Sequence, residues 1–345
     1  MNPFLLPFSA GFRLGVALRH AAYRHGWFKT RRLARPVVSV GNLTVGGTGK
    51  TPLVAYVARI LMSRGWMPSI LTRGYARRSK AALVVVPPGE GRHGDAREIG
   101  DEPALLAGML PNVPLIVCAD RFRGGQVAEE RFRVDAHILD DGFQHLALAR
   151  DVDLVALDAT QTISSWGLLP AGRQREPLTA LQRAPMVVLT RTDSADPERL
   201  EELVRKFHPA AGIFRSHTKL VGCTDARSNT AVAVEEIRPQ KVAAFCAIGN
   251  PRAFFGDLRR WGFNLVGEDA FPDHHGYTGN EIHELAARAR RSGAAALLTT
   301  QKDAVKLSPD WTTPLPVLAC AIELQIPAAE DFEKTLLSYL KQARS

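Results

Sequence analysis

The chain has 345 residues, of which 46% are hydrophobic and 23% charged. This composition fits a soluble globular protein of one large or two moderate domains, and it excludes a disordered chain, a collagen-like repeat and a polytopic membrane protein. The net charge of +9 is unevenly distributed: residues 1–89 contain fourteen Lys and Arg but no Asp or Glu, whereas the other 256 residues contain 30 basic and 35 acidic side chains. The excess positive charge therefore lies in the N-terminal quarter, and a partner attracted by it is expected to bind there.

The N-terminal segment, residues 1–34, is basic and amphipathic. At 100° per residue, one side of a helix collects the apolar residues Leu14, Leu18, Ala21, Ala22 and Phe28. The opposite side collects Arg13, His20 and Arg24. We interpret the segment as a helix that lies in a membrane interface and is attracted to anionic lipid; the alternative is a helix that packs on its own domain. The sequence contains no run of about 18 apolar residues, so we do not expect a membrane-spanning helix.

From residue 36 onward, short apolar runs alternate with helical stretches, which predicts an α/β fold with a largely parallel sheet. The first series of expected strands is Pro36–Val40, Ser69–Leu71, Ala82–Val86, Leu115–Cys118, Ala136–Leu139, Leu154–Leu157 and Met186–Leu189. After a more polar stretch around Lys206–Asn229, a second series follows at Val242–Ile248, Asn264–Val266, Ala295–Thr299 and Val317–Ala321. The helices expected among them are Arg252–Trp261, Gly279–Ser292 and Ala328–Lys341. We therefore expect a core lobe over residues 35–212 and a smaller α/β lobe over 213–345, with a ligand cleft between them.

The most informative motif is a glycine-rich turn between the first strand and a helix expected over Thr51–Arg64. The turn reads Thr44-Val45-Gly46-Gly47-Thr48-Gly49-Lys50-Thr51. Backbone N–H groups of such a turn curl around phosphate oxygens, and the helix N-terminus adds its positive dipole end. Lys50 is expected to reach the β- and γ-phosphates of a nucleotide, and the Thr51 hydroxyl to ligate Mg²⁺. The motif departs from the generic P-loop only at Thr44, where a glycine is usual.

An acidic pair, Asp140 and Asp141, follows the expected strand Ala136–Leu139. Adjacent carboxylates repel each other unless they share a cation, so the pair indicates a Mg²⁺-organising role beside the P-loop.

Elsewhere, the acidic turn Gly100–Pro103 is expected to cap the helix Ala104–Leu110. The loop Phe271–His275 of the second lobe contains an acid and two imidazoles, which suggests metal binding or proton transfer. Arginines are scattered through loops of the first lobe, where together they would form an anion-binding wall.

The four cysteines lie far apart and show no metal-ligand spacing. We expect them to be reduced and mostly buried, as in a cytosolic protein.

In combination, these motifs resemble one family, the tetraacyldisaccharide 4′-kinases of lipid A assembly in Gram-negative bacteria. The matching stretches are SVGNLTVGGTGKTP (39–52), TRGY (72–75), GDEP (100–103), DDGFQH (140–145), LPAG (169–172) with REP (175–177), FPDHH (271–275) and TTQKDAV (299–305). They occur in family order and cover most of the chain. Thr44 is itself the form that the family has at this position.

The resemblance implies transfer of the γ-phosphoryl group of ATP, with Mg²⁺, to the 4′-hydroxyl of a tetraacylated glucosamine disaccharide 1-phosphate, which gives lipid IV-A. It also implies two α/β/α lobes and a peripheral or monotopic enzyme at the cytoplasmic face of the inner membrane. Neither nucleic acid nor an obligate protein partner is expected.

The resemblance also assigns roles to single residues. Lys50 contacts the phosphates and Thr51 the metal. Asp140 and Asp141 form the acidic pair near Mg²⁺, and Asp141 is also one of the catalytic residues. Asp101 accepts or steers the proton of the 4′-hydroxyl, with His274 as its partner across the cleft. Four further residues match family positions near substrate or nucleotide, namely Tyr75, Arg121, Arg175 and Glu176.

Two other functions compete with this interpretation. A P-loop GTPase or metallochaperone-type NTPase is the first, because Thr190–Asp193 and Thr300–Asp303 loosely match the guanine-reading loop. The second is a basic protein that binds membrane surfaces or nucleic acid and keeps a vestigial loop. The low aromatic content of 7% argues against nucleic-acid binding.

Overall fold

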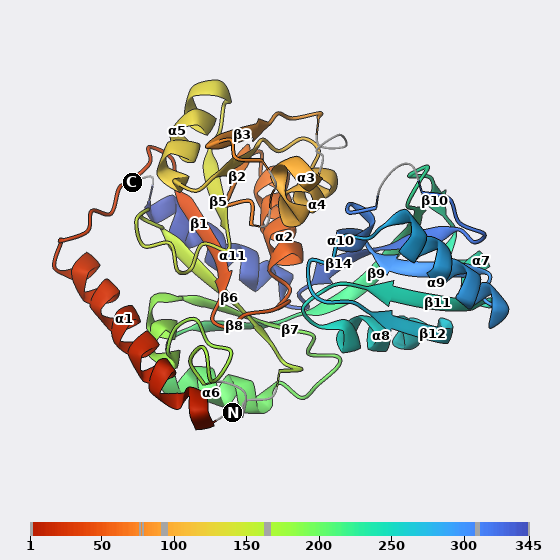
Figure 1. The fold of residues 1–345 in the computed structure, drawn as a ribbon. Coiled ribbons are helices and arrows are strands. Elements are labelled where there is room, and N and C mark those ends of the chain that lie inside the picture. Colours follow the sequence, from red (N-terminus) through yellow and green to blue (C-terminus); the bar gives the residue numbers. More distant parts are fainter. Residues whose placement is uncertain are drawn as a thin grey trace.

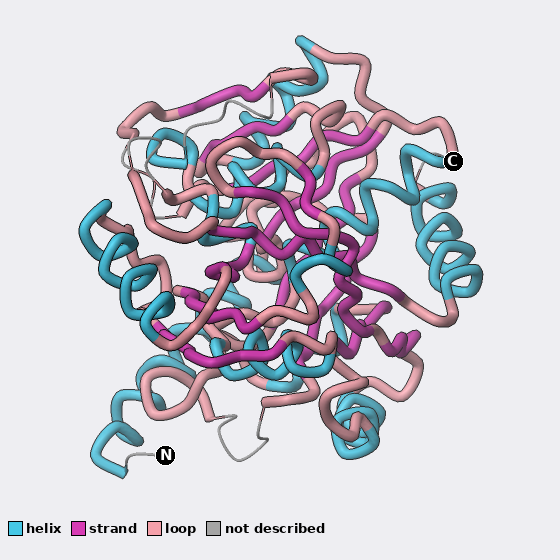
Figure 2. Tube along the Cα trace, turned by 90° about the vertical axis from the view of Figure 1, so that its right-hand side faces the viewer, coloured by secondary structure: helices cyan, strands magenta, loops and turns pink. Residues whose placement is uncertain are grey.

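A computed structural model describes residues 3–75, 77, 79–90, 96–161, 167–307 and 311–343. The chain forms two lobes side by side, each built on one sheet (Figure 1). A view turned by 90° shows strands in the interior and helices around them (Figure 2). The predicted α/β architecture with largely parallel sheets is thus confirmed.

The larger sheet has eight strands in the order β3-β4-β2-β5-β1-β6-β7-β8. Their bounds are β1 Val37–Asn42, β2 Pro68–Thr72, β3 Leu83–Val86, β4 Leu115–Cys118, β5 Ala136–Asp140, β6 Val152–Asp158, β7 Met186–Thr190 and β8 Gly212–Arg215. All neighbouring strands are parallel except β3, which runs antiparallel to β4. The carboxyl ends of β1 and β5, which are direct neighbours, therefore meet at the same edge of the sheet.

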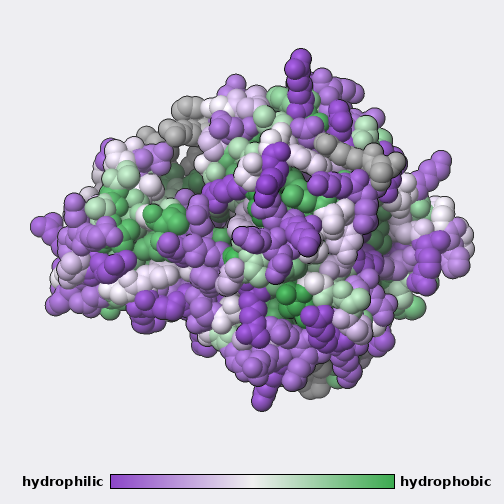
Figure 3. Space-filling model, turned by 180° about the vertical axis from the view of Figure 1, so that it is seen from behind, coloured by the Kyte–Doolittle hydropathy of each residue, from purple (hydrophilic) through white to green (hydrophobic). Residues whose placement is uncertain are grey.

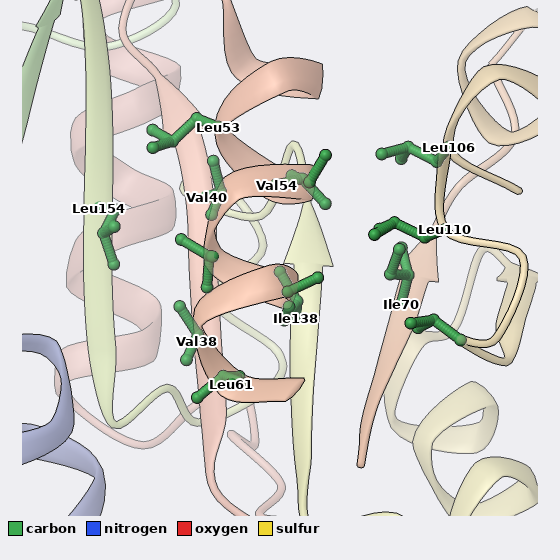
Figure 4. Packing of buried hydrophobic residues seen from close by; sticks show 14 of the residues in the cluster. Val38, Val40, Leu53, Val54, Leu61, Ile70, Leu106, Leu110, Ile138 and Leu154 are labelled. Carbon is green, nitrogen blue, oxygen red and sulfur yellow. The ribbon is translucent and has the colours of Figure 1, made fainter. Parts of the chain in front are cut away.

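Helices cover both faces of this sheet. The bounds are α2 Lys50–Ser63, α3 Ala96–Ile99, α4 Asp101–Met109, α5 Arg121–Arg131, η3 Leu178–Arg183 and α6 Glu198–Phe207. Figure 4 shows Leu53 and Leu61 of α2 beside Val38 and Val40 of β1. Because consecutive strand residues alternate between faces, β6 contributes Leu154 to this core and its neighbouring residues to the core under η3 and α6.

The C-terminal helix α11, Ala329–Gln342, returns to the first lobe. Its buried residues Phe332, Leu336 and Leu340 belong to the same core as α2. The Phe332 ring packs edge-on against Tyr56 and Phe214 at centroid distances of 5.6 and 5.1 Å. A single boundary drawn near residue 212 therefore leaves this helix apart from the core that it completes.

The smaller sheet has six strands in the order β10-β9-β14-β13-β11-β12. Its strands are β9 His217–Asp225, β10 Ala231–Val232, β11 Lys241–Cys246, β12 Asn264–Ala270, β13 Ala296–Thr300 and β14 Val317–Gln325. The helices of this lobe are α7 Val234–Ile237, α8 Pro251–Arg260, α9 Gly279–Arg291 and α10 Gln301–Ala304. Residues on the two faces of β11 belong to different cores, one with α8 and one with α9.

The stretch 206–229, described above only as polar, contains two strands, β8 and β9, which the sequence pattern missed. Strand β9 pairs antiparallel with β14 over most of its length and is only partly buried. A strand at this position needs few apolar residues, so its composition resembles that of a loop. The four cysteines are free and buried, as expected.

Helix α1, Leu6–Arg24, follows the short helix η1, Pro3–Leu5, and lies along the outside of the first lobe (Figure 1). Ser9 donates to the carbonyl of Leu168 and accepts from the amide of Ala171, both at 2.9 Å. His20 lies 3.1 Å from the buried carboxylate of Glu176. The opposite side leaves Leu14 and Leu18 about 60% exposed. No described helix combines the length and apolar character that a membrane crossing requires.

Seen from behind, most of the molecular surface is hydrophilic, and apolar residues form small separate patches (Figure 3). The buried clusters are thus covered by helices and loops.

Replacement of Phe332 by alanine tests the role of α11 in the first lobe. The ring is fully buried, so we expect Phe332→Ala to lower the free energy of unfolding by about 3–5 kcal/mol. Amide hydrogen exchange of β1 and β6 peptides in increasing urea measures this loss in the first lobe. Lys334→Ala, on the exposed side of the same helix, is the control and should stay within about 0.5 kcal/mol. Equal losses in the two variants would contradict the assignment.

Candidate active site

A cavity of about 690 Å³ lies between the lobes. The first lobe contributes residues 45–52 of the glycine-rich turn and the ends of β2 and β5, and the second lobe contributes the loops after β11, β12 and β13. Of the predicted site residues, it is lined by Val45, Gly46, Gly47, Thr48, Gly49, Lys50, Thr51, Tyr75, Arg121, Asp140, Asp141, Arg175 and His274. Residues as far apart in the chain as Val45 and His274 thus line one cavity.

The glycine-rich turn has the backbone conformation of a phosphate-binding loop. Gly46 and Gly49 have φ angles of 108° and 82°, a region that side chains other than glycine rarely adopt. A Cβ on Gly46 would lie 2.3 Å from the Arg173 guanidinium. Lys50 begins α2, so its ammonium and the N-terminus of that helix face the cavity together.

Neighbouring loops hold this turn in place. Arg173 and Val45 exchange two hydrogen bonds, Val45 N to Arg173 O at 2.8 Å and Arg173 Nη2 to Val45 O at 3.0 Å. Arg191 donates to the Gly47 carbonyl at 3.0 Å, and Thr190 donates to the Thr48 carbonyl at 3.0 Å. With its carbonyls occupied in this way, the turn presents N–H groups to an incoming anion.

The acidic pair lies directly opposite Lys50. Asp141 Oδ1 is 3.6 Å from Lys50 Nζ, and Asp141 Oδ2 is 2.7 Å from Arg175 Nη1. Burial raises the pKa of Asp141, but Lys50 and Arg175 outweigh it and hold this pKa below its usual range. Asp141 is therefore ionised at neutral pH.

Asp140 has the opposite environment. Its Oδ2 accepts from Thr72 at 3.0 Å, while its buried Oδ1 has no hydrogen-bond partner among the described residues. Burial, followed by the nearby charges of Glu102 and Asp141, raises the pKa of Asp140 to about 7. An unpartnered buried carboxylate oxygen at this position requires a cation or a proton.

These residues fit a magnesium ion. Mg²⁺ in phosphoryl-transfer sites takes one or two protein oxygens and completes its shell with phosphate and water. Asp140 Oδ1 and the Thr51 hydroxyl supply such oxygens at the cavity wall. The described residues contain no group of three or more His, Cys, Asp and Glu that could hold a metal ion.

Asp101 and His274 meet across the boundary between the lobes. Asp101 is the first residue of α4, and its Oδ2 lies 3.2 Å from His274 Nδ1. His274 lines the cavity, whereas Asp101 is not among the lining residues and contacts the cavity through the imidazole. His274 has a φ of 63°, a conformation in which a non-glycine residue is uncommon and which aims the side chain toward the first lobe.

Three of the four predicted substrate-binding residues line the cavity. Arg121 is buried and, together with Arg73 and Arg175, forms a cationic wall near the acidic pair. Tyr75 is 70% exposed, and its ring lies 5.7 Å from the His274 ring. The wall matches the expected gathering of loop arginines.

Thr44 and Glu176 lie outside this cavity. Thr44 is buried and bonds to Gln161 at 3.0 Å. Glu176 is buried beside Arg183 and His20, so it contacts α1 of the N-terminal segment.

The structure adds residues that the sequence interpretation did not single out. Arg19, Glu102, Gln144, His145, Arg191 and Lys302 all line the cavity. Most of them belong to the motifs quoted above, and their motif positions were the available signal. Arg19 carried no such signal, since only the fold brings α1 to the cavity, where Arg19 donates to the Gln144 carbonyl at 3.0 Å.

The loops that loosely match a guanine-reading motif are engaged within the protein. Asp193 pairs with Arg260 at 3.1 Å. Asp303 is fully buried and accepts from the Ala247 amide and the Tyr277 hydroxyl, both at 3.1 Å. This arrangement does not support a GTPase.

Burial and neighbouring arginines have a measurable consequence at His145. Burial, followed by Arg121 and Arg150, lowers the pKa of His145 to about 4. We expect the imidazole to be neutral at pH 7 and to titrate near pH 4 in an NMR titration of histidine ring carbons. Arg121→Gln removes a cation that disfavours protonation, so it should raise this pKa.

Arg123→Gln, an exposed position two residues along the same helix, is the control and should leave the His145 titration unchanged. A wild-type midpoint near 6.5 would contradict the buried, cationic environment.

Comparisons with known proteins identify the family of the chain. A family model described as tetraacyldisaccharide-1-P 4′-kinase matches residues 1–341. Proteins named tetraacyldisaccharide 4′-kinase are 39% identical over 331 residues in Geobacter metallireducens, covering 95% of both chains, and 40% identical over 305 residues in Pelobacter propionicus, covering 88% of this chain and 82% of the relative.

A crystal structure of LpxK from Aquifex aeolicus in complex with ATP is 32% identical in sequence. It superposes with a TM-score of 0.78 and covers 97% of this chain and 98% of its own. The chain therefore belongs to the tetraacyldisaccharide-1-P 4′-kinase family.

Proposed function

We propose that this chain transfers the γ-phosphoryl group of ATP to the 4′-hydroxyl of a tetraacylated glucosamine disaccharide 1-phosphate, the step of lipid A biosynthesis that yields lipid IV-A. One observation carries the proposal: a phosphate-binding loop with Lys50 and an Asp101–His274 pair face the same cavity from different lobes. Membership of the family gives this cavity its substrates.

ATP binds with its β- and γ-phosphates in the glycine-rich turn. The amides of residues 45–51 and the Lys50 ammonium contact the phosphate oxygens. Thr51 and Asp140 would hold a Mg²⁺ ion, which would supply positive charge to neutralise the phosphates. Asp141 orients Lys50 and Arg175, because its two oxygens each face one of these cations.

The Asp101–His274 pair handles the proton of the acceptor hydroxyl. His274 faces the cavity, and Asp101 fixes its orientation through Nδ1. The pair takes the hydroxyl proton as a unit while the oxygen attacks phosphorus and the bond to the ADP oxygen breaks. Proton loss late in the reaction suffices, since the transition state of phosphoryl transfer is loose.

The arginine wall and Tyr75 position the disaccharide. Arg121 and Arg175 supply fixed positive charge beside the acidic pair, where the transferred phosphoryl group develops negative charge. Glu176 acts from outside the cavity, because it holds His20 and thereby α1 against the first lobe.

Helix α1 docks the enzyme on the cytoplasmic surface of the inner membrane. Its polar contacts through Ser9 and His20 face the protein, while Leu14 and Leu18 point outward. Phe8 and Trp27 are 67% and 78% exposed on the same segment, and Arg13 and Arg24 are exposed as well. An outward apolar face with a basic rim binds an anionic interface, and this arrangement brings a lipid acceptor to the cavity that Arg19 lines.

The kinase proposal is tested with γ-labelled ATP, Mg²⁺ and the disaccharide monophosphate in mixed micelles. Wild-type protein should produce labelled bisphosphate, and Asp101→Asn and His274→Ala should each reduce kcat about 100-fold or more. Because the pair acts as a unit, the double variant should resemble the worse single variant. Failure of the wild type to label the lipid would refute the kinase assignment, and multiplicative losses would refute the coupling.

The membrane proposal is tested by liposome sedimentation with anionic vesicles. The double variant Leu14→Gln with Leu18→Gln removes apolar area from the outward face, so the partition coefficient should fall about tenfold or more. Val221→Gln, at an exposed apolar position on β9, is the matched control and should bind like the wild type. Unchanged binding of the double variant would refute the role of α1.

A further inference from the structure

Lys302 occupies a junction between the lobes that the mechanism above does not use. It lies in α10 of the second lobe, which contacts α4 of the first lobe. Its Nζ is 3.2 Å from Glu102 Oε1 and 3.6 Å from Asp273 Oδ1. The side chain is 16% exposed, so this ion pair is shielded from bulk water.

The two carboxylates that Lys302 contacts are the chain neighbours of the Asp101–His274 pair. Glu102 follows Asp101 on the first turn of α4, and Asp273 precedes His274 in the loop after β12. One ammonium therefore links the two backbone segments whose relative position sets the distance between Asp101 and His274.

The support of Lys302 is rigid and shared with His274. The Thr300 hydroxyl accepts from the Asp303 amide and caps α10. The fully buried Asp303 accepts from the Ala247 amide at 3.1 Å and pairs with Lys306 at 2.7 Å. The carbonyl of the same Ala247 accepts from the His274 amide at 3.3 Å. Lys302 and His274 thus depend on one buried carboxylate.

The charge of Lys302 is already compensated within the protein. Burial lowers the pKa of this ammonium, but Glu102 and Asp273 outweigh the effect and keep its pKa above the ordinary value. A lysine between two carboxylates has little net charge left for a phosphate group. Its geometry fits an ion pair that links two loops of the protein better than a contact with a bound phosphate.

We propose that Lys302 is a positioning residue. Through its ion pairs with Glu102 and Asp273, it keeps Asp101 and His274 within hydrogen-bond distance across the lobe boundary. The inference rests on the proposed function, because it assigns Lys302 a role in the proton-handling pair of that reaction.

The kinetic test compares Lys302→Met with Lys302→Arg in the labelled-lipid assay. Lys302→Met should lower kcat about tenfold or more and change KM for ATP by less than about threefold, because the phosphate loop is untouched. Lys302→Arg keeps the charge and should recover most of kcat. Arg59→Met is the control, since it breaks a 3.1 Å ion pair between α2 and β14 away from the pair, and it should have wild-type kcat.

The decisive measurement repeats Lys302→Met in a His274→Ala background. A residue that acts through the pair should then have little further effect on kcat. A tenfold loss in both backgrounds, or an unchanged kcat in the single variant, would overturn the inference.

A second readout does not require activity. Hydrogen exchange of peptides that cover residues 271–275 and 101–105 should accelerate in Lys302→Met, while peptides from α9 keep their wild-type rates. If the wild type does not phosphorylate the lipid, the proposed function fails, and the exchange measurement alone decides whether Lys302 holds these loops together. Unchanged exchange in both loops would refute the proposal that Lys302 holds them together.

Discussion

The site depends on one constraint: parallel neighbouring strands end at the same edge of a sheet. Because β1 and β5 are paired in register, the loop after β1 and the acidic pair after β5 are forced together, and Lys50 comes to lie 3.6 Å from Asp141. Burial then magnifies every charge at this edge. Asp141 is stabilised as an anion by two cations, whereas Asp140, one residue earlier, lacks a partner for one oxygen. The same sheet edge thus creates both an anion fixed by two cations and a buried carboxylate oxygen without a hydrogen-bond partner among the described residues.

The second lobe contacts the first both through apolar residues, such as Leu324 of β14 in the core beside α2, and through polar side chains near the cavity. Asn250 Nδ2 donates to Thr160 at 3.2 Å, Arg260 pairs with Asp193, and His274 meets Asp101. The backbone of Gly249 also approaches the glycine-rich turn so closely that a Cβ there would lie 2.6 Å from the Gly47 amide. The catalytic arrangement is therefore assembled from parts that only the contact between lobes brings into range.

The sequence pattern predicted those elements whose structure depends on neighbouring residues in the chain, such as buried strands and the motifs at their ends. The strand Leu115–Cys118 was predicted with its observed bounds, because a buried parallel strand is a continuous apolar run, and the P-loop and acidic pair were placed at strand ends for the same reason. Strand β9 escaped because a half-exposed antiparallel strand has a mixed composition. The contacts of Lys302 with Glu102 and of Glu176 with His20 were beyond prediction, since each joins residues more than 150 positions apart through tertiary packing alone.

Helix α1 belongs to the N-terminal quarter that lacks acidic residues, and its orientation on the first lobe is unusual. A helix on a soluble domain normally buries its apolar side, but α1 buries Ala22, turns Ser9 and His20 toward the protein, and leaves Leu14 and Leu18 exposed. Its anchors are the loop at Leu168 and the buried Glu176, and between them Arg173 bonds to Val45 of the phosphate-binding turn. The segment 168–176 therefore contacts both the helix with the outward apolar face and the glycine-rich turn. A displacement of α1 would act on the same segment that holds this turn in place.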